Sequence, residues 1–257
     1  MLEELYAGSV ADAARRAESI SVSQVERAAL AAKPALNALA FLAPADHMKV
    51  LAEVKRASPS KGEMAEIADP AALASIYATN GASAISVLTE ERRFKGSLED
   101  LVAVRAAVDV PLLRKDFIAN EYQILEARAA GADIVLLIVA GLAQKDIVRL
   151  KDFAGQLGMT AFIETHSADE VSRALDLGVS LLGVNARDLS TFETDRNLFA
   201  KLSPMIPDGI IKVAESAVRT VEDVINYRQG GADVVLVGEA LVTNDAATLL
   251  QAFTNVR

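Results

Sequence analysis

The sequence predicts an α/β fold, namely a (β/α)8 (TIM) barrel with an N-terminal helical extension. From about residue 50 onward, eight short segments rich in Val, Ile and Leu alternate with eight helix-like segments. The apolar segments do not alternate with polar residues, which is typical of parallel strands that helices cover. Eight strand–helix units in about 200 residues match the usual size of such a barrel.

A short internal repeat favours the same fold. Residues 131–137 read G-A-D-I-V-L-L and residues 231–237 read G-A-D-V-V-L-V, half a barrel apart. The competing fold is an open Rossmann-type sheet, which usually has a G-x-G-x-x-G turn after its first strand. The sequence has no such turn, and no linker composition interrupts the series. We therefore expect one domain over residues 1–257.

The strands are predicted over residues 50–55, 84–88, 111–115, 134–138, 160–164, 181–185, 210–214 and 234–237. The helices are predicted over residues 70–79, 98–107, 122–130, 144–156, 168–177, 197–202, 221–228 and from 246 onward. Three helices have starts that resemble a capping box, at Ser97, Ser167 and Thr220. Residues 1–48 are expected to form the helical extension, in which Ser23 caps a helix over residues 24–32.

The composition argues against several classes of protein. A net charge of −9 is unsuited to binding nucleic acid or an anionic membrane, which would need a basic face. The sequence has no cysteine for a disulfide or a thiolate nucleophile, and its two histidines offer little for a zinc site. It contains neither a secretory pattern nor an apolar run of about 18 residues that could span a membrane. We therefore expect a soluble cytoplasmic protein.

Polar residues follow the predicted strands, where a barrel of this kind builds its active site. After six of the strands they are Glu53, Lys55, Thr89, Glu90, Arg114, Lys115, Glu164, Asn185, Arg187, Glu215 and Ser216, and Gly238 and Glu239 follow the eighth strand. Six strands that end in this way, with both signs of charge around one mouth, indicate a functional site.

These residue types favour acid–base chemistry. Lys55 and Lys115 are expected to approach each other and to lower each other's pKa, which suits a lysine general acid. Glu164 ends an apolar strand and is expected to be a base whose pKa burial raises. Residues 214–217 and 237–240 follow the last two strands, which commonly bind phosphate in this fold. Gly238 would let the backbone approach an anion closely. The sequence therefore predicts a small phosphorylated anion as substrate, and it offers no evident site for a metal or redox cofactor.

Five motifs resemble those of the indole-3-glycerol phosphate synthase family of tryptophan biosynthesis. They are E-V-K-R-A-S-P-S-K-G (53–62), S-V-L-T-E-E-R-R-F-K-G (86–96), L-R-K-D-F-I (113–118), G-V-N-A-R-D-L (183–189) and A-E-S (214–216). The resemblance runs from about residue 49 to 245, in order. It implies a lyase that decarboxylates and dehydrates 1-(2-carboxyphenylamino)-1-deoxyribulose 5-phosphate, without a cofactor. It also implies that the N-terminal extension lies over the barrel mouth, and other tryptophan-pathway enzymes are candidate partners.

The resemblance also implies roles for individual residues. Lys115 resembles the general acid that protonates the substrate carbonyl, Glu164 the acid–base partner in dehydration, and Lys55 the lysine near the substrate carboxylate. Glu53, Asn185 and Glu215 resemble the residues that orient the anthranilate part. Phe117, Leu136 and Leu189 resemble the apolar wall for the ring. The positions around the phosphate are Ser58, Arg187, Ser216, Gly238 and Glu239.

A few residues stand apart from this pattern. Ala217 occupies a position where the family usually has glycine, which bears on the geometry of the phosphate loop. His166 follows Glu164 by two positions and is expected to pack behind the site. The pair Arg92–Arg93 is expected to be solvated or to contact Glu90.

Two other functions compete with the synthase. A sister barrel such as phosphoribosylanthranilate isomerase would be expected to use a catalytic cysteine or aspartate pattern, and the sequence has no cysteine. A non-catalytic phosphate-binding barrel would be expected to have lost part of the acid–base set. Lys55, Lys115, Glu164 and Glu215 are all present.

Overall fold

The computed structural model describes residues 1–59, 62–64, 66–189, 191 and 193–257, and it confirms the (β/α)8 barrel. The closed sheet has the strand order β1-β10-β9-β8-β7-β6-β5-β4, and every pair of neighbours is parallel. Its strands are β1 (Lys49–Val54), β4 (Ala84–Leu88), β5 (Leu112–Lys115), β6 (Ile134–Ile138), β7 (Thr160–Thr165), β8 (Leu181–Asn185), β9 (Ile211–Glu215) and β10 (Val234–Val237). The predicted bounds are met at four of these strands and are off by one residue at β1, β5, β7 and β9.

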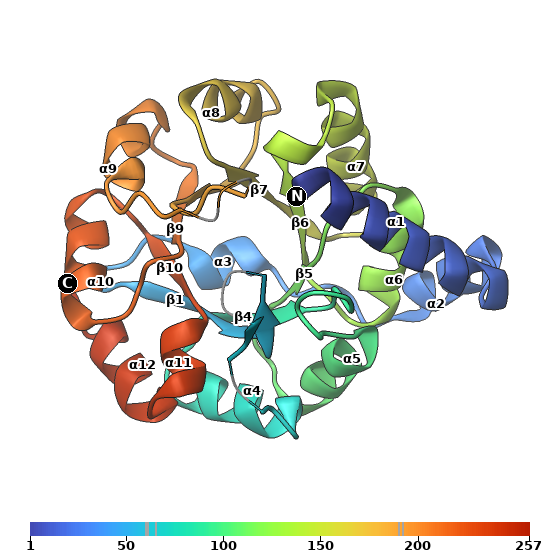
Figure 1. Ribbon diagram of the computed structural model, residues 1–257, viewed down its shortest axis with the longest axis horizontal. Coiled ribbons are helices and arrows are strands. Elements are labelled where there is room, and N and C mark those ends of the chain that lie inside the picture. The colour runs from blue at the N-terminus through green and yellow to red at the C-terminus, as the bar shows by residue number, and fades with distance from the viewer. Residues whose placement is uncertain (60–61, 65, 190, 192) are drawn as a thin grey trace.

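The helices form a ring around the sheet (Figure 1). This ring contains α4 (Pro70–Thr79), α5 (Leu98–Ala107), α6 (Glu121–Ala129), α7 (Gln144–Gln156), α8 (Ala168–Leu175), α9 (Leu198–Leu202), α10 (Val221–Gln229), α11 (Glu239–Thr243) and α12 (Ala246–Thr254). Two 3-10 turns, η1 (Val139–Gly141) and η2 (Ser203–Met205), lie between ring elements. Ser97, Ser167 and Thr220 cap α5, α8 and α10 as predicted, each accepting a backbone N–H three residues on. The short α11 was not predicted.

Alternation along the strands divides the core in two, because successive strand side chains point to opposite faces. On β1, Val50 and Ala52 pack outward against the helices, whereas Leu51 points into the barrel. On β5, Leu112 faces outward and Leu113 faces inward. Inward apolar residues such as Leu51 and Leu113 therefore fill the interior of the barrel near the start of the strands. The inward positions nearer the carboxyl ends of the strands are available for a functional site.

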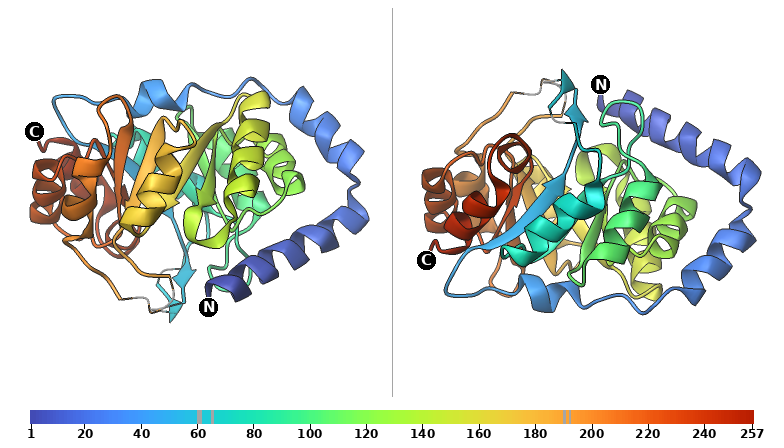
Figure 2. Two further views of the ribbon diagram at one scale, coloured as in Figure 1. Left: turned by 90° about the horizontal axis from the view of Figure 1, so that it is seen from above. Right: turned by 90° about the horizontal axis from the view of Figure 1, so that it is seen from below.

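The N-terminal extension has three helices: α1 (Leu2–Ser19), α2 (Val22–Ala31) and α3 (Ala38–Leu42). The predicted cap at Ser23 is wrong, since Ser21 forms the capping box with Gln24 and Ser23 already lies inside α2. The helix α3 was not predicted. Its buried Ala38 and Leu42 join the inner apolar cluster, and it lies across the end of the barrel opposite α1 (Figure 2).

A short antiparallel pair, β2 (Ala57–Ser58) and β3 (Gly62–Glu63), follows β1 at the same end of the barrel as the start of α1 (Figure 2). Ser60 and Lys61 of the first sequence motif lie outside the described residues. None of the helices in the described part of the chain is long and apolar enough to cross a membrane.

Candidate active site

On several strands the inward face carries a polar residue after an apolar one, whereas the inward residues of β6 and β10 are all apolar. Leu51 is followed at the same parity by Glu53 and Lys55, Leu113 by Lys115, and Phe162 by Glu164. On β8 and β9 the same parity gives Asn185 and Glu215. Side chains two residues apart lie on the same face of a strand, and the carboxyl ends of parallel strands meet at one end of a barrel. These two rules are enough to bring the polar side chains together at the barrel mouth.

These side chains surround one cavity of about 1230 Å³, counting the open solvent at its rim. Its lining includes every residue to which the resemblance assigns a role: Glu53, Lys55, Ser58, Lys115, Phe117, Leu136, Glu164, Asn185, Arg187, Leu189, Glu215, Ser216, Gly238 and Glu239. Thr89, Glu90 and Arg114, which also follow predicted strands, are not part of this lining, and the buried Arg114 donates to Thr89 and Asp116 instead. The lining also includes Ala217 of the expected phosphate loop, and residues that were not predicted, namely Pro59, Leu88, Phe94, Asp116, Ile138, Thr194, Arg196, Val218, Arg219 and Leu236. Strand parity could have identified Ile138 and Leu236, whereas Thr194 and Arg196 lie on a loop without a sequence signal.

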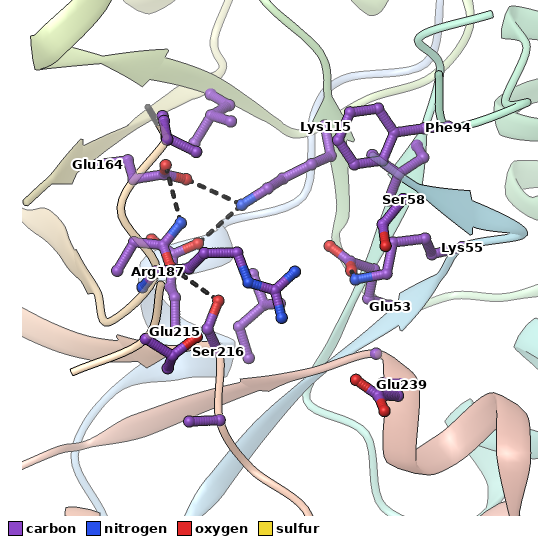
Figure 3. Close-up of a pocket in the computed structure, with 18 of the residues that line it drawn as sticks. Glu53, Lys55, Ser58, Phe94, Lys115, Glu164, Arg187, Glu215, Ser216 and Glu239 are labelled. Carbon is purple, nitrogen blue, oxygen red and sulfur yellow. Dashed lines mark hydrogen bonds and ion pairs between the residues drawn. The ribbon is translucent and has the colours of Figure 1, made fainter. Parts of the chain in front are cut away.

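Lys115 is the centre of the charged cluster. Its Nζ lies 2.9 Å from Oε2 of Glu164 and 2.7 Å from Oε2 of Glu215 (Figure 3). Burial by itself would lower the pKa of Lys115, but Glu164, Glu215 and Glu53 outweigh it and hold the pKa above its usual range. The expectation that two lysines depress each other's pKa is therefore wrong for Lys115. Lys55 instead pairs with Glu53, at 2.7 Å.

The pKa values of the two glutamates beside Lys115 are shifted in opposite directions. Burial by itself would raise the pKa of Glu164, but Lys115 and His166 hold it well below the usual range. The prediction of a raised pKa for Glu164 is therefore wrong in the free protein. Burial, together with the charge of Glu164, raises the pKa of Glu215 to about 8. Two carboxyls with divergent pKa values can divide acid and base roles between them.

Asn185 links three strands of the site. Its Nδ2 donates to Oε1 of Glu164 at 3.1 Å, and its Oδ1 accepts from the Ser216 hydroxyl at 2.8 Å. The backbone N–H of Arg187 donates to the same Oδ1 at 3.0 Å. These bonds fix the amide orientation, so Asn185 presents a donor to Glu164 and holds the loop after β9.

The loop after β9 has an unusual backbone. Ser216 and Ala217 have φ values of 69° and 60°, in the left-handed region that favours glycine. Ala217 thus adopts the conformation open to the glycine that the family usually has there, at some cost in strain. On the next loop, a Cβ atom on Gly238 would lie 2.6 Å from Oε1 of Glu53 and 3.1 Å from Nζ of Lys55. The Glu53–Lys55 pair therefore requires glycine at position 238.

An apolar wall faces the charged cluster. It contains Phe117, Leu136 and Leu189, together with Phe94, whose ring centroid lies 6.1 Å from that of Phe117. Glu90 holds Phe94 in place, because its carboxylate accepts the backbone N–H groups of residues 92, 93 and 94. The expected contact of Arg92 and Arg93 with Glu90 is thus present, but their backbone N–H groups make it and not their side chains. The Arg92 side chain pairs with Asp12 of α1 instead.

The extension contacts the same region. Tyr6 of α1 meets Phe117 edge to face, with ring centroids 5.6 Å apart. The hydroxyl of Ser9 donates to Asp116 at 2.9 Å, and Asp116 directly follows Lys115 in the sequence. Within the described ranges, no three His, Cys, Asp or Glu side chains are arranged to hold a metal ion.

Such a barrel, with lysines and carboxyls around one cavity and an aromatic wall beside them, is that of an acid–base enzyme. The family model for indole-3-glycerol phosphate synthase matches residues 2–253, and the chain belongs to this family. An indole-3-glycerol phosphate synthase of Leifsonia xyli subsp. xyli is 61% identical over 256 residues, which cover 100% of this chain and 98% of that protein. One of Beutenbergia cavernae is 54% identical over 243 residues, covering 95% and 90% of the two chains.

A solved structure of thiamine phosphate pyrophosphorylase from Pyrococcus furiosus is similar with a TM-score of 0.63. It is 15% identical and covers 81% of this chain and 95% of that one. At this identity the likeness concerns the fold alone. The family membership decides against the isomerase and the non-catalytic barrel as alternatives.

Proposed function

We propose that this chain catalyses the ring closure of 1-(2-carboxyphenylamino)-1-deoxyribulose 5-phosphate to indole-3-glycerol phosphate, carbon dioxide and water. The family membership supports this reaction. The observation that carries it is the position of Lys115, which donates to two carboxyls with pKa values shifted in opposite directions and lies beside an aromatic wall.

Lys115 is the general acid of the first step. The ring carbon that bears the carboxylate attacks the ketone carbon of the substrate, and Lys115 protonates the carbonyl oxygen as the new C–C bond forms. Glu164 and Glu215 hold the Lys115 ammonium in the mouth, since each accepts a hydrogen bond from Nζ. A proton donor held in place before the reaction avoids part of the entropic cost of orienting it.

Lys55 lies near the substrate carboxylate, which leaves as carbon dioxide and restores the aromatic ring. The 2.7 Å pair with Glu53 fixes the ammonium against Gly238. Glu164 then acts as the acid–base partner while the hydroxyl leaves as water. Its low pKa in the free protein supplies the ionised form that a base requires.

The remaining residues bind the two ends of the substrate. Phe117, Leu136 and Leu189 cover the anthranilate ring, and Glu53, Asn185 and Glu215 orient its carboxylate and nitrogen. The phosphate lies among Ser58, Arg187, Ser216, Gly238 and Glu239, which line the same cavity. Arg219 follows Ser216 on that wall and adds positive charge for a phosphate.

We also propose that residues 1–257 act as one domain with α1 over the barrel mouth. The Ser9–Asp116 hydrogen bond and the 2.6 Å pair between Arg16 and Glu126 support this placement. Tryptophan-pathway enzymes are proposed as partners and the cytoplasm as the location, on the basis of the family and the acidic composition.

The reaction is tested by mixing purified protein with the carboxyphenylamino substrate and following indole fluorescence. We expect fluorescence to rise with enzyme concentration and carbon dioxide to appear in equal amount. A protein that binds the substrate without forming either product contradicts the proposal.

A further inference from the structure

His166 lies between two carboxylates at the end of β7. Its Nε2 is 3.2 Å from Oε1 of Glu164, and its Nδ1 is 3.2 Å from Oε2 of Glu170. Only 10% of its side chain is exposed. The expectation that this residue merely packs behind the site therefore omits two polar contacts, one of them with a residue of the charged cluster.

Glu170 belongs to the first turn of α8 and is fixed there. Its backbone N–H donates to the Ser167 hydroxyl at 3.2 Å, and its Oε2 accepts the backbone N–H of His166 at 2.8 Å. The same oxygen holds Nδ1 of the ring. The helix start thus sets the ring orientation and leaves Nε2 facing Glu164. Both ring nitrogens thus lie close to a carboxylate oxygen, although Nε2 and Oε1 of Glu164 do not have hydrogen-bond geometry. Although burial lowers the pKa of His166, Glu164 and Glu170 raise it to about 10.

The two carboxylate oxygens of Glu164 have different partners. Oε1 faces His166 and Asn185, whereas Oε2 accepts from Lys115. His166 is not among the residues that line the described wall of the cavity, so it acts on a substrate only through Glu164. The arrangement leaves Oε2 as the atom that exchanges protons on the cavity side.

We propose that His166 is a positioning residue, which holds the Glu164 carboxylate with Oε2 toward Lys115 so that proton transfer runs through that atom. This inference rests on the role of Glu164 in the proposed function. The charged and titratable groups that face the pair are Glu170 from α8, Lys115 from β5, Glu215 from β9 and Tyr6 from α1. Because burial and Glu164 keep the pKa of Tyr6 well above its usual value, Tyr6 stays neutral.

The test compares His166→Ala with His166→Gln, which keeps an amide donor near Nε2 without the charge. We expect His166→Ala to lower kcat roughly 10- to 100-fold, because a displaced acid–base group loses its alignment. KM should stay within about threefold, since His166 does not reach the cavity. The acidic limb of the pH profile of kcat should move to higher pH in both variants, because Glu164 loses a neighbouring cation. His166→Gln should recover part of kcat.

His47→Gln is the matched control, because His47 contacts the surface residue Asp46 and its side chain is 40% exposed. It should leave kcat and its pH profile unchanged. It also leaves His166 as the one histidine of the chain, so its imidazole signal in NMR can be assigned. That ring should remain protonated well above neutral pH. Titration near pH 7, or a folded His166→Ala variant with wild-type kcat and pH profile, overturns the inference.

Glu164→Gln separates this inference from the proposed function. If Glu164→Gln keeps wild-type kcat, the role of Glu164 itself is wrong. If Glu164→Gln is inactive while His166→Ala behaves like the wild type, only the positioning role is wrong. Should His166→Ala fail to fold, Glu170→Gln is the alternative variant, because it weakens the contact that orients the His166 ring and lies outside the cavity. It should shift the acidic limb in the same direction, and an unshifted limb counts against the inference.

Discussion

Lys115 reaches across the barrel mouth and donates to Glu215 over 2.7 Å. The two residues end β5 and β9, which lie four places apart in the eight-stranded closed sheet. The contact spans the whole opening, so the acid at the end of β5 depends on a strand on the far side. Buried charges of this kind are costly unless they are paired, and pairing also fixes where the ammonium lies.

Lys115→Met is expected to abolish turnover nearly completely while product binding stays within about tenfold. A general acid acts chiefly in the transition state, so its loss appears in kcat. Steady-state kinetics and titration with indole-3-glycerol phosphate measure the two effects. Lys145→Met, on the exposed face of α7, is the control and should keep full activity. Parallel loss of binding and turnover would make Lys115 an anion-binding residue instead.

Gly238→Ala tests the close approach of β1 and β10. The added methyl would lie 2.6 Å from Oε1 of Glu53, so the Glu53–Lys55 pair must move. Misplacement by about 1 Å can cost about 100-fold in rate, and we expect a loss of about 10- to 100-fold in kcat/KM. Gly155→Ala is the control, because a Cβ there meets no atom within 4 Å. If both variants keep wild-type rates, the Glu53–Lys55 geometry does not matter to catalysis.

The sequence predicts the barrel and its inward polar residues well because both depend on local periodicity. Leu51, Glu53 and Lys55 share one face of an extended strand whatever the rest of the chain does. The sequence does not predict α3, the helix across the end of the barrel opposite α1, because five residues are too few to show a helical period. The low pKa of Glu164 was missed for a different reason. It depends on Lys115, 49 positions away in the chain, and on a histidine whose ring orientation is set by the next helix.

Ala217→Gly should stabilise the protein. The left-handed conformation costs an alanine about 1–2 kcal/mol, whereas glycine adopts it freely. The opposing effect is the greater entropy of glycine in the unfolded chain, which costs about 0.4–1 kcal/mol of stability. We therefore expect the free energy of unfolding to rise by about 0.5–1 kcal/mol. KM should not change, because the backbone already has the conformation that glycine would take. Denaturant unfolding measures the difference.

Ala32→Gly is the matched control for this substitution. Ala32 is half-buried with a φ of −64°, so it has no strain to relieve. The same change there should destabilise the protein by about 0.4–1 kcal/mol. If both variants lose stability equally, residue 217 does not carry backbone strain.

Glu215→Gln tests the protonation of the carboxyl beside Lys115. Burial and the charge of Glu164 raise the folded-state pKa of Glu215 to about 8, above its unfolded value near 4.5. Between these two pH values the folded protein holds a proton that the unfolded chain has released. Stability from this group is therefore complete below about pH 4.5 and is lost as the pH rises toward 8. Glutamine resembles the protonated form at every pH. The melting temperature of Glu215→Gln, relative to that of the wild type, should consequently increase from pH 5 to pH 9. A difference that stays constant or falls over this range would show that Glu215 is ionised in the folded protein, with Lys115 as its ion-pair partner.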